Sequence, residues 1–393
     1  MEDPYSIRVV TTLEEFNSLS EQWNSLLEES NVDNIFLTWE WLYIWAKYYL
    51  GGNRLWILLV FKGEGHLVGI GPFYLKKRMW RKLFPVRRLL FLGTNEESLI
   101  SEYLNIICRP DEGELVTRSI LQFIVQEDLC DDLSLRTMES ATQTTLHFKQ
   151  MAKSQGFFTR VSHAGKSPYI QLPNKYHDFM SQCSPSMRYN IRRQKRKLVR
   201  YDAHFRKTET SSQLENDFPE FIRLHQLRWE SREMPGSFAG GQFPLFQKRI
   251  MQEMLVKGYL ELRFLSFSGK NVAVLYNICY RGKIYYYQSG LDISFDKTLS
   301  LGLLLHDHAI QDAIERSLYE YDFLLAGKMD DYKFRWTKES RDFCDIYMTR
   351  SRTIKMSVLI KNNARTLYTL MKSVRSLARF SKTHTSFDSR LGV

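Results

Sequence analysis

The sequence predicts an α+β protein whose two halves repeat one plan, in which helices are followed by a mostly antiparallel mixed sheet and then by a further helix. The chain has 393 residues, of which 44% are hydrophobic, so it is long enough for two domains with cores of their own. With 20 Gly and 10 Pro, the composition excludes a disordered chain, a collagen and a coiled-coil rod. We predict a first domain over 1–175, a second over 176–352, and a C-terminal amphipathic helix with its tail over 353–393.

The first half opens with two expected helices. Thr12 and Glu15 have the spacing of a capping box, and the apolar residues that follow at helical period predict a helix over 12–29. The aromatic segment FLTWEWLYIWAKYYL predicts a second helix over 36–50. Periodicity and turn residues then predict strands 55–61 and 67–75 around the turn GEG, strands 88–92 and 103–108, a helix 113–127, a strand 132–138, a helix 143–155 and a strand 167–172.

The second half begins with a basic segment, 176–200, which we expect to be two helices separated at Pro185. Next come a strand, two helices and a β-meander whose last turn is Arg281-Gly282. The expected elements are strand 203–207, helices 214–232 and 243–257, strands 260–266, 271–280 and 283–289, helix 300–316, strand 321–324, a loop 329–335 and strand 342–348.

The net charge of +11 is concentrated in three basic windows. Residues 76–88 hold seven basic residues and no acidic one, 188–207 hold nine against one, and 350–393 hold ten against one. Such windows attract phosphates or anionic lipid headgroups, although each could also be an ordinary solvated face. Along the basic helix expected over 188–200 and the residue after it, only Tyr189 and Tyr201 are aromatic, so a nucleic acid is not an expected partner.

The basic residues after 353 alternate with apolar residues at helical spacing. The predicted amphipathic helix could lie on an anionic membrane surface or pack against its own domain. No apolar run approaches the ~20 residues that span a bilayer, and the acidic start MEDPYSIR has no apolar signal region. We therefore expect a cytoplasmic chain, with peripheral contact at the inner membrane surface as the alternative.

Several catalytic signatures are absent from the sequence. It has no GxSxG elbow, no HExxH, no Walker loop and no GxGxxG after a strand, and its five cysteines form no CxxC pair. The sequence therefore gives no support for a hydrolase, metalloprotease or nucleotidase function. We expect that the protein holds no metal ion.

Polar and aromatic residues instead gather in motifs at element ends. In the first half these are FLTWEWLYIW and GIGPFYLKKR, and in the second PSMRYNIRRQKRKL, HQLRWESREMPGSF, YYYQSGLD, the SLG before LLLHDHAI, and YDFLLAGKMDDYKFRWTK. Their order resembles the CelD/BcsL-like acyltransferases, the branch of the GNAT superfamily named for an acetyltransferase involved in cellulose biosynthesis and related to the FemAB-type transferases. The resemblance covers nearly the whole chain. It implies tandem GNAT-like (acyl-CoA N-acyltransferase) domains and transfer of an acyl group from a thioester such as acetyl-CoA to an amine or hydroxyl.

In the fold that the resemblance implies, the donor pyrophosphate binds at the start of the helix after the fourth strand, where the helix dipole favours an anion. Gly290, Ser300, Leu301 and Gly302 are the expected donor-binding residues. The sequence has a single glycine there, where CoA-binding relatives have a glycine-rich loop. The donor could therefore be an acyl carrier protein or an aminoacyl-tRNA instead, and Gly302 could be an ordinary helix-start glycine.

His225 and Trp229 lie four residues apart on one expected helix, and Arg228 lies on the same side. We expect Trp229 to form a wall of the acceptor pocket and His225 to act as general base. Asp322 as base and Tyr332 as acid are the further candidates that the resemblance implies, and structural roles for His225 and Asp322 are the alternatives. The other expected substrate-binding residues are Arg228, Tyr287, Lys333 and Trp336, with Arg192 and Arg193 on a phosphate-rich substrate.

Taken together, the resemblance implies a bacterial acyltransferase acting on a sugar or lipid-linked precursor of a cell-envelope polysaccharide. Two alternatives stay open at this point. One is a non-catalytic partner in envelope biosynthesis that binds phosphorylated lipid carriers, and the other is a FemAB-like transferase that depends on aminoacyl-tRNA.

Overall fold

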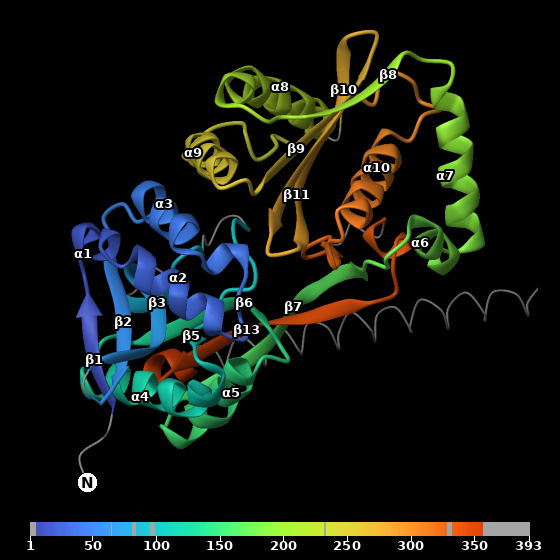
Figure 1. The fold of residues 1–393 in the computed structure, drawn as a ribbon. Helices are drawn as coiled ribbons and strands as arrows, with labels where there is room; N and C mark the ends of the chain where they lie inside the picture. The colour runs from blue at the N-terminus through green and yellow to red at the C-terminus, as the bar shows by residue number, and fades with distance from the viewer. Residues whose placement is uncertain are drawn as a thin grey trace, which may run out of the picture.

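The computed structural model describes residues 5–63, 65–80, 84–94, 99–231, 233–327 and 332–356. The expected C-terminal helix lies outside these residues from 357 on, as does part of the expected loop 329–335. The α+β class is confirmed, because within the described ranges thirteen strands form one mixed sheet with helices on its faces (Figure 1).

The first half of the chain forms one end of this sheet. Its strands are β1 (Tyr5–Val10), β2 (Arg54–Lys62), β3 (His66–Trp80), β4 (Phe84–Phe91), β5 (Ile107–Cys108), β6 (Asp132–Glu139) and β7 (Phe158–Gln171). Its helices are α1 (Leu13–Asn17), α2 (Ser20–Glu29), α3 (Trp39–Tyr49), α4 (Gly113–Gln126) and α5 (Gln143–Ser154), with 3₁₀ turns η1 (Ile35–Leu37) and η2 (Pro110–Glu112). α4 packs against β1, β2 and β3, and α2 packs against β3 and β5.

Two helix predictions for this half need correction. The capping box of Thr12 and Glu15 is present, but the predicted helix 12–29 is broken into α1 and α2, with Ser18 as the C-cap of α1. The predicted helix 36–50 begins only at Trp39, because the Thr38 side chain caps α3 and the preceding residues form a 3₁₀ turn. Strand β1, which pairs with β2, was not predicted from the sequence.

The second half forms the other end of the sheet. Its strands are β8 (Ala203–Lys207), β9 (Leu260–Phe267), β10 (Lys270–Tyr280), β11 (Lys283–Leu291), β12 (Glu320–Asp322) and β13 (Ser340–Thr349). Its helices are α6 (Tyr176–Gln182), α7 (Pro185–Leu198), α8 (Ser211–Glu230), α9 (Phe243–Val256) and α10 (Leu301–Glu315), with the 3₁₀ turn η3 (Lys333–Arg335). The expected helices and strands of this half are confirmed, with ends shifted by no more than three residues.

A pair of long strands joins the two halves. β13, the last strand of the described chain, pairs with β6 and β7 among the strands of the first half. β7 pairs with β13 over most of its length and with β12 over its last residues, 169–171. In Figure 1 the two strands run side by side from one body of the molecule into the other. Residues 340–349 therefore complete the sheet of the first half, while the domain boundaries at 175 and 352 stay a prediction.

The hydrophobic core also crosses between the halves. One cluster of buried residues includes side chains from α2, α3 and β2 together with others from α8, α9 and β10. The rings of Trp41 and Phe246 meet edge to face at 5.6 Å, and those of Phe36 and Tyr285 at 5.9 Å. Each fully buried large apolar side chain contributes roughly 1.5–3 kcal/mol, so these contacts hold the two halves against each other. A second cluster lies on the opposite face of the second half, under α6, α7 and α10.

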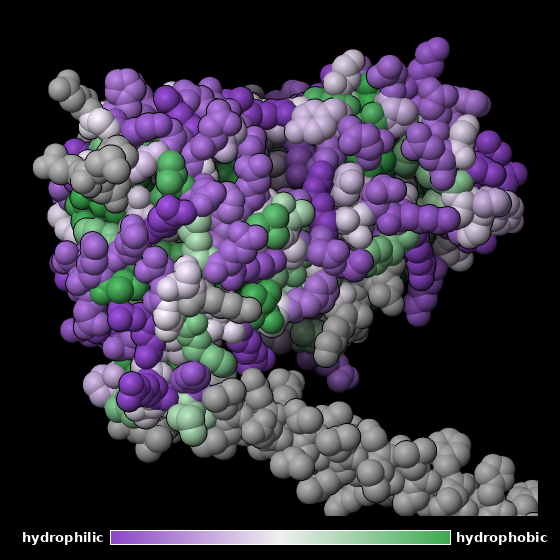
Figure 2. Space-filling view, turned by 90° about the horizontal axis from the view of Figure 1, so that it is seen from below, coloured by the Kyte–Doolittle hydropathy of each residue, from purple (hydrophilic) through white to green (hydrophobic). Residues whose placement is uncertain are grey.

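The surface seen in Figure 2 carries mainly hydrophilic side chains, and its hydrophobic residues form scattered patches. In the part of the chain that the structure describes, no helix has both the length and the hydropathy needed to cross a bilayer.

Candidate active site

The candidate active site lies where two neighbouring parallel strands part. β11 and β12 are paired over three positions, the last of which places Tyr285 opposite Asp322. β12 ends there, whereas β11 continues to Leu291. Beyond the last pair, β11 has a bulge against β10 at Tyr287, and a bulge leaves one residue outside the ladder and re-aims its neighbours. Two cavities open along this part of β11.

The larger cavity has a volume of about 710 Å³ and lies between α7, the end of β11 and the start of α10. This volume is within the range of ligand-binding sites. Four of its lining residues are basic, namely Arg193, Arg228, Lys297 and Arg335, and one is acidic, Asp296. The excess of positive charge favours an anionic ligand.

The first turn of α10 forms part of the wall of this cavity. Ser300, Leu301, Gly302 and Leu303 all line it. The backbone N–H of Ser300 donates to the side-chain oxygen of Gln194 at 3.0 Å. The next three N–H groups have no acceptor within the helix, because the first turn of any α-helix leaves its donors unpaired. Together with the helix dipole, they are suited to hold a phosphate group.

The smaller cavity has a volume of about 270 Å³ and is built by both halves of the chain. Its lining from the first half is Leu99, Ile100 and Glu102, and its lining from the second half is His225, Arg228, Trp229, Tyr286, Tyr287, Gln288, Ser289, Leu324, Leu325, Tyr332 and Lys333.

A shared wall separates the two cavities, and it consists of Arg228, Tyr286, Ser289 and Tyr332, which line both. Arg228 Nη1 donates to Ser289 Oγ at 2.5 Å. The hydroxyl of Tyr286 is hydrogen bonded to Ser289 Oγ at 2.8 Å and to the hydroxyl of Tyr332 at 3.0 Å. A chain of hydroxyl groups, with a guanidinium at one end, therefore lies between the two cavities.

Tyr286 has an unusual electrostatic environment within the shared wall. Burial alone would raise the pKa of its hydroxyl, but the positive charges of Arg228 and Lys333, together with the hydrogen bonds to Ser289 and Tyr332, outweigh burial and hold that pKa below its usual value. The ammonium group of Lys333 lies 5.6 Å from the centre of the Tyr286 ring. A tyrosine in this setting can release or return a proton more easily than a tyrosine in water.

His225, the predicted base, is buried in α8 and lines the smaller cavity. The indole N–H of Trp229 donates to His225 Nε2 at 2.9 Å, so this nitrogen is the acceptor and Nδ1 carries the proton. Nδ1 lies 3.2 Å from the side-chain oxygen of Gln226. Burial lowers the pKa of His225 to about 4, and both ring nitrogens are engaged. The histidine therefore orients the indole of Trp229 in the cavity wall.

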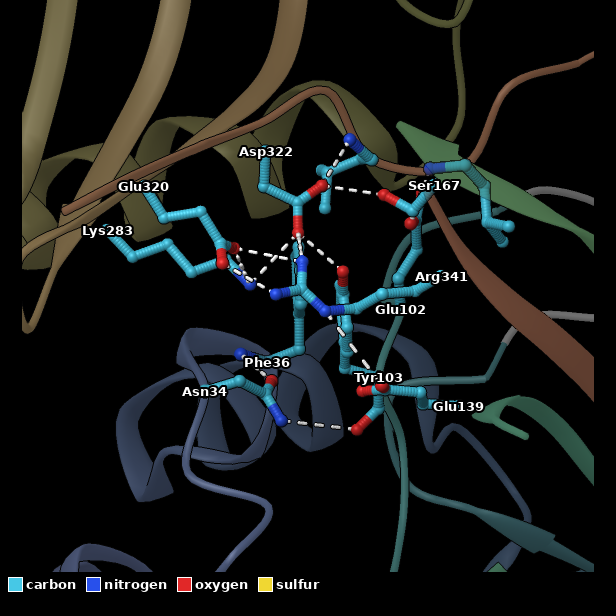
Figure 3. Close-up of polar contacts among 12 residues, drawn as sticks. Asn34, Phe36, Glu102, Tyr103, Glu139, Ser167, Lys283, Glu320, Asp322 and Arg341 are labelled. Carbon is cyan, nitrogen blue, oxygen red and sulfur yellow. Dashed lines mark hydrogen bonds and ion pairs between the residues drawn. The ribbon is translucent and has the colours of Figure 1, made fainter. Parts of the chain in front are cut away.

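Asp322 is buried in a polar network at the junction of the halves and lines neither cavity (Figure 3). Its carboxylate accepts hydrogen bonds from Ser167 Oγ at 2.6 Å, from the backbone N–H of Leu324 at 2.7 Å, and from the hydroxyl of Tyr103. The ammonium group of Lys283 lies 2.9 Å from it. Burial opposes ionisation, but Lys283 and these hydrogen bonds hold the pKa of Asp322 below its usual value.

Glu102 lies beside this network and reaches the smaller cavity from the first half (Figure 3). Its side chain is buried, and Oε2 accepts a hydrogen bond from the backbone N–H of Leu325 at 2.7 Å. Burial raises the pKa of Glu102 to about 8, against the opposing effect of Lys333. Glu102 is therefore a carboxyl group that changes its charge near neutral pH.

The other predicted site residues fall into four groups, according to whether they line the smaller cavity, the larger cavity, both or neither. Lys333, Trp229 and Tyr287 line the smaller cavity, Arg193 and Trp336 line the larger one, and Tyr332 and Arg228 line both. Arg192 is exposed on α7 and lines neither cavity. Gly290 also lines neither: a Cβ there would lie 2.4 Å from the backbone nitrogen of His225, so this glycine lets α8 pack closely against β11.

Three residues of the site, Glu102, Tyr286 and Ser289, were not predicted from the sequence. Tyr286 and Ser289 lie inside the motif YYYQSGLD, but the motif alone gives no reason to prefer Tyr286 over its neighbours. A carboxylate between apolar residues in LISEYLNII was the only available signal for Glu102. Within the described residues, no group of three or more His, Cys, Asp or Glu side chains is arranged to hold a metal ion.

Comparison with known proteins gives one family match in the second half of the chain. Residues 185–334 match the family described as the acetyltransferase (GNAT) domain. This range contains α7, α8, β11, the start of α10 and the shared wall. No curated protein sequence matches the chain.

Solved structures extend the likeness to both halves. The structure of FemX aligns with a TM-score of 0.57 and 10% identity, covering 90% of this chain and 99% of FemX. The structure of L-PGS from Bacillus licheniformis aligns with a TM-score of 0.52 and 14% identity, covering 87% of this chain and 96% of that one. Residues 185–334 are thus similar to the acetyltransferase (GNAT) domain, and 87–90% of the chain shares its fold with L-PGS and FemX.

Proposed function

We propose that this protein is an acyltransferase that moves an acyl group from an acyl-CoA donor in the larger cavity to an amine or hydroxyl of an acceptor in the smaller cavity. The observation that carries the proposal is the shared wall of Arg228, Tyr286, Ser289 and Tyr332. A donor and an acceptor on its two sides would have their reacting atoms close together, and such positioning is a large part of catalysis. Transfer would then be direct, within a ternary complex.

The larger cavity suits an anionic donor. The free N–H groups of Leu301, Gly302 and Leu303 would bind the pyrophosphate of a CoA thioester. Gly302 has no packing need for its missing side chain, because a Cβ there would meet only Leu291 Cδ1, at 3.7 Å. The glycine instead leaves room at the cavity wall.

The bulge of β11 suits the acyl group. The thioester carbonyl would lie near Tyr287, where the backbone leaves the ladder and an N–H could stabilise the negative charge on the tetrahedral intermediate. Tyr332 would supply the proton that the leaving thiolate needs, and the hydroxyl of Tyr286 at 3.0 Å would help to restore it.

The acceptor is proposed to be a sugar or lipid-linked precursor of a cell-envelope polysaccharide. This rests on the resemblance to the cellulose-biosynthesis acetyltransferases, and Trp229 in the wall of the smaller cavity supports it, because an indole face packs well against a sugar ring.

Calorimetric titration with acetyl-CoA tests the donor site. Gly302→Asp places a carboxylate where the pyrophosphate would bind, and Gly302→Asn has the same shape without the charge. We expect the wild type and Gly302→Asn to bind acetyl-CoA and Gly302→Asp to lose at least tenfold in affinity. No binding by the wild type would contradict the CoA donor and favour a carrier-protein or aminoacyl-tRNA donor, or the non-catalytic partner.

A further inference from the structure

The segment that carries Glu102 is fixed on every side. The carbonyl of Ile100 accepts a hydrogen bond from the hydroxyl of Tyr287 at 2.9 Å, and Ser101 Oγ accepts one from the indole N–H of Trp41 at 2.8 Å. The next residue, Tyr103, has a φ of +55° and donates its hydroxyl to the Asp322 network. A non-glycine residue in this conformation is held there by its surroundings. The fold therefore directs the Glu102 side chain into the smaller cavity.

The two oxygens of Glu102 have different environments. Oε2 accepts the backbone N–H of Leu325, whereas no residue of the described ranges donates a hydrogen bond to Oε1. Oε1 is not among the enclosed side-chain atoms that lack a partner, so it is accessible from the cavity that Glu102 lines and is not sealed in the core. A carboxylate with one oxygen anchored and the other open to a cavity is well placed to accept a proton from a ligand there.

We propose that Glu102, contributed by the first half of the chain, is the general base of acyl transfer in the second half. This proposal rests on the proposed function. In the step, the acceptor's O–H or N–H bond breaks, its proton goes to Glu102 Oε1, and its lone pair forms the new bond to the acyl carbon. The C–S bond of the donor then breaks, the sulfur takes its proton from Tyr332, and solvent exchanges protons with both residues to restore them.

The other candidate bases are less well placed. Trp229 already occupies the only unprotonated nitrogen of His225, and Asp322 lies outside both cavities with its oxygens hydrogen bonded. Glu102 also has a suitable pKa, about 8, since a base works best when its pKa is close to the working pH.

Several charged or titratable groups face Glu102. Lys333 and Lys283 favour its ionised form and Asp322 disfavours it. The cavity wall adds His225 and Arg228 on α8, Tyr286 and Tyr287 on β11, and Tyr332. Because Lys333 and Arg228 are cations, they also attract the negative charge that develops when Glu102 releases its proton.

Thiol release from acetyl-CoA tests the proposal with two small nucleophiles. Ethanolamine must lose a proton to attack, whereas hydroxylamine is already unprotonated at neutral pH and needs no base. We expect Glu102→Gln to lower the rate with ethanolamine at least 100-fold and the rate with hydroxylamine by no more than a few fold. The variant keeps an acceptor for the N–H of Leu325, so the anchor is preserved.

The matched control is Glu139→Gln. Glu139 is a partly buried carboxyl group whose pKa is also raised by burial, but it does not line the smaller cavity. The Glu139→Gln variant should release thiol at the wild-type rate with both nucleophiles. If Glu102→Gln fails to fold, the same rates are measured with Glu102→Asp. This variant keeps the carboxyl group, but its shorter side chain places that group farther from the acceptor.

The outcomes separate the two proposals. Equal losses with ethanolamine and hydroxylamine would show that Glu102 only holds Leu325 in place, and an unchanged rate with ethanolamine would likewise overturn the assignment while leaving the proposed function intact. If the wild type releases no thiol with either nucleophile, the proposed function fails and the role of Glu102 fails with it.

Discussion

Glu102 Oε2 accepts a hydrogen bond from the backbone N–H of Leu325 at 2.7 Å, although 223 positions separate the two residues in the chain. The neighbouring residues also connect the two halves of the chain. The hydroxyl of Tyr103 donates a hydrogen bond to Asp322, and Asp322 accepts one from the backbone N–H of Leu324. The smaller cavity is therefore a product of both halves. A site in the second half whose wall comes from the first should not survive separation of the halves.

The raised pKa of Glu102 predicts how stability depends on pH. Between pH 4.5 and about 8 the unfolded chain loses a proton that the folded chain keeps, so this residue lowers the stability as the pH rises through that window. Glu102→Gln removes the effect. We expect its free energy of unfolding to match the wild type near pH 4.5 and to exceed it by roughly 2–5 kcal/mol at pH 8. Urea unfolding at both pH values measures this, and a difference that does not change with pH would contradict the raised pKa.

The hydrogen bond from Trp229 to His225 predicts a positioning role for the histidine. His225→Phe removes the acceptor for the indole N–H and with it one of the contacts that orient Trp229. We expect KM for the acceptor to rise about tenfold, while kcat changes by no more than a few fold. The activity of the wild type should show no titration of this residue between pH 5 and 8, because its pKa is about 4. If turnover by the variant instead falls by two orders of magnitude or more, His225 is the base.

The buried pair of Lys283 and Asp322 predicts a large loss of stability when one partner is removed. Lys283→Met removes the nearer of the two cations at the buried Asp322 carboxylate, leaves Arg341 Nη1 3.6 Å away, and should cost about 3–5 kcal/mol. Glu114→Gln, which breaks an exposed pair with Arg118 on α4, is the comparison and should change stability by less than about 1 kcal/mol. Because the pKa of Asp322 is lowered, its contribution is present at neutral pH and is lost as the pH falls below its usual titration range. Equal effects of the two variants would show that the network does not hold the junction.

Two glycines of the predicted donor site should differ sharply on substitution. In Gly290→Ala the new Cβ would lie 2.4 Å from a backbone nitrogen of α8, so we expect a loss of roughly 1–3 kcal/mol or more. In Gly302→Ala the new Cβ would lie in ordinary van der Waals contact, 3.7 Å from Leu291 Cδ1. Alanine also stabilises a helix relative to glycine by up to ~1 kcal/mol. Thermal unfolding of the two variants measures this. Similar melting temperatures would mean that α8 and β11 do not pack as closely as described.

The sequence predicts those helices and strands that are determined by interactions between residues close together in the chain. Capping boxes, helical periodicity and the meander around Arg281-Gly282 depend on neighbouring residues, and the structure confirms the elements they mark, with α1 and α2 separated. The position of β13 was not predictable in this way, because the strand pairs with residues about 200 positions earlier in the chain.

The candidate site shows the same limit. Sequence motifs of the second half were enough to find Tyr332, Arg228 and Trp229. These residues and the start of α10 belong to the same half of the chain and line the two cavities together. Glu102 could not, because only the packing of the loop before β5 against the segment after β12 brings it to the cavity. The role of His225 depended on a hydrogen bond that spacing suggests but does not establish.

Initial-rate kinetics with acetyl-CoA and ethanolamine both varied test the central claim most directly, that the donor and the acceptor occupy two cavities on either side of one wall at the same time. Direct transfer in a ternary complex predicts double-reciprocal plots that converge. Parallel plots would show that the acyl group first moves to the protein, and no release of thiol at any concentration would show that the shared wall does not catalyse transfer from CoA.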